Sequence, residues 1–167
     1  MSSSQFAAEY IRVVKARFLD MKKTAERAFD QVDDEMIGWS PNEESNSIGI
    51  IVKHMSGNMV SRWTDFFHSD GEKPNRDRDD EFEGTITTRE ELDARWKRGW
   101  TVFLNALDGI GEDDLLRPVY IRGEAHTVME AIERQMYHYS YHVGQIVYAA
   151  KQVQKSWTTL TIPKRKK

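Results

Sequence analysis

Apolar residues recur at steps of three and four along most of the chain, with charged residues between them. This period places the apolar side chains on one face of a helix, so the pattern predicts amphipathic helices. Four long segments show the period, and stretches rich in charge, glycine and proline separate them. The predicted helices cover residues 4–31, 48–67, 88–107 and 127–153.

The last two predicted helices begin with a capping pattern. Thr88 is followed three residues later by Glu91, and Thr127 by Glu130. In a capping box, the threonine hydroxyl and the glutamate carboxylate each accept a hydrogen bond from a backbone N–H that the first helical turn leaves unpaired. The two pairs therefore mark where these helices start.

Two segments between the predicted helices have other patterns. Residues 69–87 are polar and contain glycine and proline, which indicates a long surface connection that crosses the bundle. Within residues 116–126, the strand-forming run 119–121 is followed by Gly123, which favours a turn. The chain is therefore predicted to be all-α: a four-helix bundle with a long crossover connection and a short β-hairpin before the last helix.

Length and cysteine content narrow this prediction. The 167 residues suit one domain, and we predict a single domain over residues 1–167 in which 158–167 form a tail. The chain has no cysteine and five histidines. Disulfides, thiolate metal sites and cysteine nucleophiles are therefore excluded, and any metal site must use histidine or carboxylate ligands.

Charge and hydropathy exclude several partners. The net charge of -3 argues against a nucleic-acid-binding protein, and the basic run at 164–167 is interpreted as a solvated tail. No stretch approaches the roughly 20 apolar residues of a membrane span, and the first residues lack the apolar core of a signal peptide. We therefore expect a cytoplasmic protein with no nucleic-acid or membrane partner.

Three histidines fall on apolar helix faces. His138 and His142 lie four residues apart, so they share a face and can converge on one metal ion. Alone, such a pair is a weak signal, because surface helices carry it by chance. His54 lies on the apolar stripe of the second predicted helix, where a histidine is commonly a hydrogen-bonded core residue. Together, three inward histidines on two helices favour a metal site with one or more positions left for water or substrate.

The remaining histidines and other site types fit less well. His68 is expected to be solvated at the end of the second helix, and His126 to lie on the surface of the hairpin. Tyr139 follows His138 where a zincin has glutamate, and neither histidine-bearing helix has the Glu-x-x-His motif of di-iron bundles. The sequence has no glycine-rich phosphate loop and no G-x-S-x-G motif.

Six short motifs follow one another along the chain. They are Trp39-Ser40-Pro41, Asn46-Ser47-Ile48-Gly49, Lys53-His54-Met55-Ser56-Gly57-Asn58, Arg62-Trp63-Thr64-Asp65-Phe66, His138-Tyr139-Ser140-Tyr141-His142-Val143-Gly144-Gln145-Ile146 and Trp157-Thr158-Thr159-Leu160-Thr161-Ile162-Pro163. Their order and spacing resemble the DinB/YfiT-like superfamily of helical-bundle proteins. The resemblance covers nearly the whole chain, and the last motif is similar to the tail of one uncharacterised subgroup.

This resemblance implies a four-helix bundle, commonly homodimeric, that acts on a small-molecule substrate. It implies a divalent metal, zinc or nickel with iron or manganese as alternatives, held by His54, His138 and His142. It also implies use of a low-molecular-weight thiol, which must come from outside the protein because the chain has no cysteine. We therefore expect a metal-activated water or thiol in an S-transferase or hydrolase, with no general base assigned.

Several roles and alternatives stay open at this level. Asn58 and Gln145 are placed to orient a ligand or to make structural hydrogen bonds, while Tyr139 and Tyr141 are expected to pack along the helix. Exposed tryptophan and phenylalanine on the second and third helices are expected to serve the homodimer. The main alternative is a non-catalytic bundle that binds a small ligand or a protein partner, and a stress-linked protein acting through partner contact is another. A polar pocket beside an open metal position would favour the enzyme.

Overall fold

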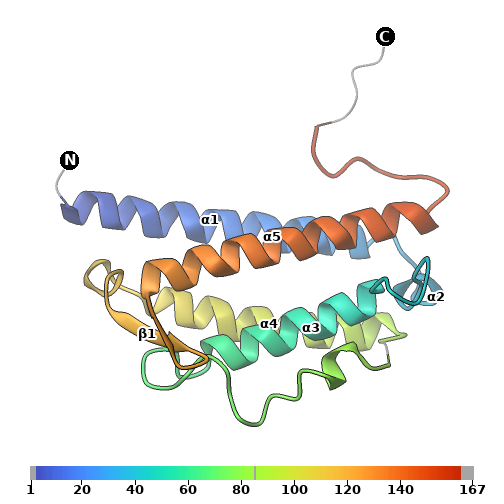
Figure 1. Ribbon diagram of the computed structural model, residues 1–167. Helices are drawn as coiled ribbons and strands as arrows, with labels where there is room; N and C mark the ends of the chain where they lie inside the picture. Colours follow the sequence, from blue (N-terminus) through green and yellow to red (C-terminus); the bar gives the residue numbers. More distant parts are fainter. Residues whose placement is uncertain (1–2, 85, 163–167) are drawn as a thin grey trace.

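Four long helices form the fold in this computed structural model, which describes residues 3–84 and 86–162. Helix α1 packs beside α5 and α3 beside α4, while α3 also contacts α5 (Figure 1). The prediction of an all-α four-helix bundle is confirmed. The long helices are α1 (Ser3–Phe29), α3 (Ile48–Trp63), α4 (Arg89–Asp108) and α5 (Val128–Val153).

The predicted helix starts agree with the structure more closely than the predicted ends. The Thr88 hydroxyl accepts a hydrogen bond from the Glu91 N–H, and Thr127 forms a complete capping box with Glu130. The second predicted helix, however, ends at Trp63 and not at residue 67. The chain leaves the helix there because residue 64 is extended and residue 65 has a φ of 50°. Apolar residues beyond the end still pack against the core, which extended the helical pattern.

The crossover connection and the hairpin are both present. Helices α3 and α4 run in the same direction, so residues 64–88 return along α3, with the 3-10 turn η1 (Asp80–Phe82) packed on it (Figure 1). The hairpin pairs β1 (Pro118–Ile121) with β2 (Glu124–Thr127) in antiparallel register. Its two-residue turn has positive φ at both positions, as a type I′ turn requires. Three short elements were not predicted: η1, α2 (Asp34–Ile37) and η2 (Glu112–Asp114).

Aromatic side chains fill the middle of the bundle. Phe18 of α1 meets Phe103 of α4 edge to face, and Tyr139 of α5 contacts both rings. The tryptophans expected on the surface of the second and third helices are at most 3% exposed. That expectation was wrong, because the apolar stripes of α3 and α4 face each other and bury the rings. The homodimer stays a prediction without this support.

The chain after α5 returns to α1. Arg27 donates hydrogen bonds to the backbone carbonyls of Leu160 and Thr159, and Gln31 pairs with the backbone of Thr158. The basic run at 164–167 lies outside the described residues. No helix within residues 3–84 and 86–162 combines the length and the apolar composition that a membrane crossing needs.

A close approach between α3 and α4 yields a stability prediction. A Cβ on Gly99 would lie 2.9 Å from the Cα of Ser56, so we expect Gly99→Ala to lower the free energy of unfolding by about 1–3 kcal/mol. Gly144 of α5 is the matched control, because a Cβ there meets nothing within 4 Å. Gly144→Ala should stabilise by about 0.5–1 kcal/mol through helix propensity. Urea unfolding of both variants tests this, and equal effects would contradict the close approach.

Candidate metal centre

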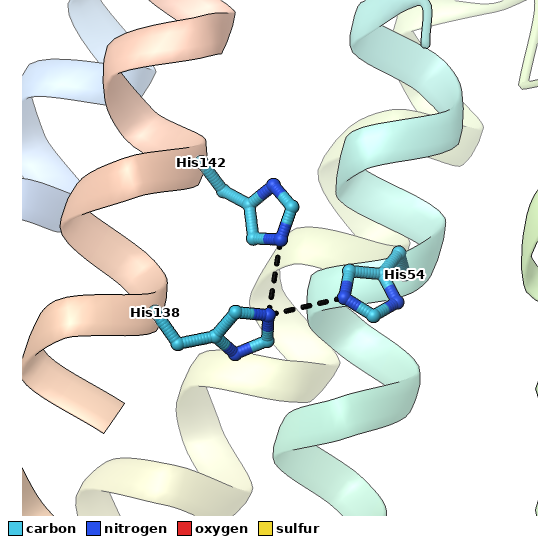
Figure 2. A group of neighbouring side chains, drawn as sticks. All are labelled: His54, His138 and His142. Carbon is cyan, nitrogen blue, oxygen red and sulfur yellow. Dashed lines mark hydrogen bonds between the residues drawn. The ribbon is translucent and has the colours of Figure 1, made fainter. Parts of the chain in front are cut away.

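Three imidazoles converge between α3 and α5. Figure 2 shows His54 from α3 facing His138 and His142 from α5. The Nε2 atom of His138 lies 3.1 Å from Nε2 of His54 and 3.0 Å from Nε2 of His142. One ligand atom from each ring lies within 4.8 Å of the others, so the three histidines can hold a metal ion. The structure thus brings together the three histidines that the sequence singles out.

Helix register explains this convergence. The four-residue step from His138 to His142 stacks their rings on one face of α5, and contact between α3 and α5 brings His54 opposite them. His54 and His142 are buried, at 5% and 7% exposure, and His138 is half-buried. The other two histidines lie elsewhere: His68 is exposed beyond the end of α3, and His126 pairs with Val119 on the hairpin.

The outer nitrogens of two rings have hydrogen-bond acceptors. Nδ1 of His54 lies 2.9 Å from a carboxylate oxygen of Glu81, and Nδ1 of His142 lies 2.8 Å from the amide oxygen of Gln145. Since both partners accept, each Nδ1 carries the proton and donates it, which assigns the tautomer from the hydrogen bonds. The Nε2 atoms of these two rings therefore present lone pairs toward His138. The two Nδ1–H hydrogen bonds therefore fix both the orientation of each ring and the nitrogen, Nε2, that is free to bind a metal.

The contacts at His138 cannot both be hydrogen bonds between neutral rings. Its Nε2 has lone-pair nitrogens on two sides, and it carries at most one proton. One contact can be a hydrogen bond, and the other then joins two lone pairs. A cation between the three nitrogens removes the conflict. Neutral imidazole nitrogens suit zinc, nickel, iron or copper, so the donor set fits a divalent transition metal.

The protonation of the rings agrees with this donor set. Burial, followed by the neighbouring imidazoles His142 and His54, lowers the pKa of His138 to about 3. Burial and His54 lower the pKa of His142 to about 4. Both rings are therefore neutral at pH 7, as ligands must be, and a metal does not have to displace protons from them.

A carboxylate and a guanidinium that the sequence analysis missed support His54. Arg76 donates two hydrogen bonds of 2.7 Å to Glu81, one to each carboxylate oxygen. Burial acts to raise the pKa of Glu81, but the hydrogen bonds from His54 and Arg76 outweigh it and leave the pKa lowered. Glu81 is thus a buried carboxylate with partners on both sides. Nothing in the sequence separates it from the other acidic residues of 77–83.

A glycine on α3 makes room for this carboxylate. A Cβ on Gly57 would lie 2.1 Å from Oε1 of Glu81, which is far inside van der Waals contact. Gly57 is one turn from His54, so the missing side chain lets the crossover connection lie close against the helix beside that ring. Lys53 fastens the same place, because its ammonium donates to the backbone carbonyls of Asp80 and Glu83.

Asn58 and Gln145 were each predicted either to orient a ligand or to make structural hydrogen bonds. Gln145 takes the first role, because it accepts the hydrogen bond that orients the His142 ring. Asn58 makes structural hydrogen bonds: its amide oxygen accepts from Gln135 and, at 3.3 Å, from the Tyr139 hydroxyl. Tyr139 is fully buried in the aromatic core, whereas Tyr141 is exposed and only touches the His142 ring edge.

Comparison with known proteins places the chain in a family. The family model described as "Protein of unknown function (DUF1572)" matches residues 5–166. The chain belongs to this family. DUF1572 is a DinB-like family, so the resemblance seen in the motifs is confirmed at that level. No curated protein and no solved structure matches the chain.

The lowered histidine pKa values predict an acid-sensitive metal-free DUF1572 protein. In the unfolded chain these rings titrate near 6.5, so below that pH the unfolded state binds more protons than the folded state. Folding stability is then lost as the pH falls from 6.5 toward 4, by at most about 1.4 kcal/mol per pH unit for each histidine. Urea unfolding at several pH values should show a flatter slope for His138→Gln. The exposed His68→Gln should keep the wild-type slope, and equal slopes for all three proteins would contradict the prediction.

The close packing at Gly57 predicts a loss of metal affinity. Gly57→Ala should displace Glu81 and leave His54 without its oriented partner, and Glu81→Gln should weaken that partner directly. Loss of the hydrogen-bond acceptor that orients a metal-ligating histidine costs about 10- to 100-fold in metal affinity. Competitive zinc titration measures the effect, with Gly144→Ala as the helix-glycine control. Wild-type affinity in both test variants would show that Glu81 does not support the ligand.

Proposed function

We propose that this protein is a divalent-metal-dependent enzyme whose metal is held by His54, His138 and His142. The observation that carries the proposal is the convergence of three Nε2 atoms, two of them on rings fixed through Nδ1. Zinc or nickel is the proposed ion, with iron or manganese as alternatives. A metal bound there would lower the pKa of a bound water or thiol and so supply a nucleophile near neutral pH.

The surroundings of the histidines support an enzyme over a purely structural metal site. A closed structural site needs four protein ligands, and the metal-ligating group found within residues 3–84 and 86–162 has three. Beside it lies a cavity of about 300 Å³ whose wall includes His54 and His138. Three ligands next to a polar cavity leave room for a substrate, which is the arrangement of catalytic sites.

The chain's own residues have defined tasks in this proposal. Glu81 and Gln145 hold two ligand rings by their Nδ1–H groups, and Arg76 keeps Glu81 ionised and in place. The cavity beside the rings receives the substrate. Because the chain has no cysteine, a thiol nucleophile must enter with a small co-substrate. We therefore propose S-transfer from a low-molecular-weight thiol, or hydrolysis if water takes its place.

Metal analysis and turnover together test the proposal. Protein purified without a histidine tag should contain or take up about one divalent ion per chain, the stoichiometry of one three-histidine site. It should then consume a low-molecular-weight thiol in the presence of an electrophile, or hydrolyse activated esters. His138→Ala should lose metal and activity while keeping its helical circular dichroism.

The matched control is His126→Ala, a histidine removed from the hairpin outside the cluster. It should bind metal and turn over substrate like the wild type. Absence of metal from reconstituted wild-type protein would refute the site. Full metal occupancy without turnover of any thiol or ester would instead favour a non-catalytic module.

A further inference from the structure

Arginines surround the cavity beside the metal centre. Its wall includes His54, His138, Asn58 and Gln135. A cavity of this size accommodates a small molecule. Besides Tyr137, the wall includes five arginines: Arg62, Arg76, Arg78, Arg122 and Arg134.

Four separate parts of the fold deliver these arginines. Arg62 comes from the end of α3, Arg134 from the first half of α5, and two more from the crossover connection. Arg122 occupies the hairpin turn with a φ of 56°. The Asp70 carboxylate fixes that turn by accepting hydrogen bonds from the backbone N–H groups of Arg122 and Gly123, at 2.8 and 2.7 Å. Convergence from distant parts of the sequence indicates a built site.

The helix register relates the arginines to the metal ligands. On α3, four-residue steps lead from His54 through Asn58 to Arg62, and on α5 one such step leads from His138 back to Arg134. Since α3 and α5 run in opposite directions (Figure 1), both arginines lie on the same side of the histidines. At 1.5 Å per residue, the arginines sit about 6 to 12 Å along the helix axes from the rings.

Positive charge exceeds negative charge in this cavity. Within the two described ranges, two carboxylates form ion pairs with three of the five arginines. Glu81 pairs with Arg76. Glu72 is shared between Arg122 at 3.1 Å, Arg76 at 3.3 Å and Arg62 at 3.5 Å. The excess of guanidinium groups creates a positive potential that attracts an anion.

Arg62 is the strongest indication of a missing partner. It is 4% exposed, and its Nε and Nη1 atoms have no hydrogen-bond partner among the described residues. Among the described residues its carboxylate contact is to Glu72, and at 3.5 Å it is long. Burial lowers the pKa of Arg62, Glu72 opposes this, and the neighbouring arginines lower the pKa further. A buried guanidinium with unpaired donors is costly, so a ligand that pairs with it is strongly favoured.

Resting on the proposed function, we infer that this cavity binds the anionic end of the substrate while its reacting group lies at the three histidines. Guanidinium groups recognise carboxylate and phosphate oxygens through paired hydrogen bonds. The substrate class is therefore a small molecule that carries a carboxylate or a phosphate about 6 to 12 Å from its reacting group, the distance given by the helix rise. Arg62 is the buried arginine of the cavity wall, whereas Arg78, Arg122 and Arg134 are exposed.

Calorimetric titration with simple probes tests this inference. Inorganic phosphate, succinate and the neutral succinamide are titrated into metal-free and zinc-loaded wild type, Arg62→Met and Arg134→Gln. Arg98→Gln is the matched control, because it removes the same charge from an exposed position of α4 outside the cavity. At least one anion should bind wild type and the control, succinamide should not, and each cavity variant should weaken binding at least tenfold.

The outcomes separate the inference from the proposed function. The tighter of the two anions identifies the end group as phosphate or carboxylate. Anion binding no stronger than succinamide binding, or equal binding by all variants as expected for an adventitious ion only, would overturn the inference. Zinc titration of the same proteins is independent: zinc binding without anion binding removes only the inference, whereas anion binding without zinc binding removes only the metal proposal. Arg62→Met should melt no lower than wild type without ligand, which shows that lost binding is not unfolding.

Discussion

The candidate site depends on the hydrogen bond between Nδ1 of His54 and Glu81. The bundle brings three histidines together by helix register, but this bond decides which nitrogen of His54 faces the other two rings. It also ties the crossover connection to α3 at the level of the site, where Gly57 leaves space for the carboxylate. Arg76 completes the chain of contacts and keeps the buried carboxylate ionised. The same hydrogen bond therefore sets both the orientation of the His54 ring and the path of the crossover connection along α3.

The groups around the site favour a cation at the histidines and an anion in the cavity beside them. Neutral imidazoles meet at Nε2 atoms that lack enough protons to satisfy one another, which favours a cation. In the adjoining cavity, two helical turns along α3 from His54, buried Arg62 has two donors without partners among the described residues, which favours an anion. A divalent ion alone would add to an already positive cavity, and an anion alone would leave the nitrogens in conflict. A cation and an anion bound together would each offset the electrostatic cost of the other, because opposite charges attract.

The features that depend on helical periodicity could be predicted from the sequence, whereas the site residues of the crossover connection could not. The four helices, the caps at Thr88 and Thr127 and the grouping of three histidines follow from spacing on helix faces. Glu81 and Arg76 could not be found this way, because residues 64–88 have no period and offer many similar charged side chains. The end of α3 was misplaced for a related reason: apolar residues past Trp63 pack on the core from irregular backbone. The spacing of apolar residues predicts which side chains are buried, but it does not predict the backbone conformation that buries them.

The crossover connection is therefore better understood as half of the site than as a linker. A bundle whose middle helices run in the same direction needs a long return segment, and here that segment lies along α3. Its polar groups are used: Ser61 of α3 pairs with the backbone of Gly71 and Lys73, and Lys53 holds the η1 turn. The same segment supplies both the carboxylate that orients the His54 ring and two arginines of the cavity wall. Helix packing thus sets where the three histidines meet, while the crossover connection supplies part of the wall of the cavity beside them.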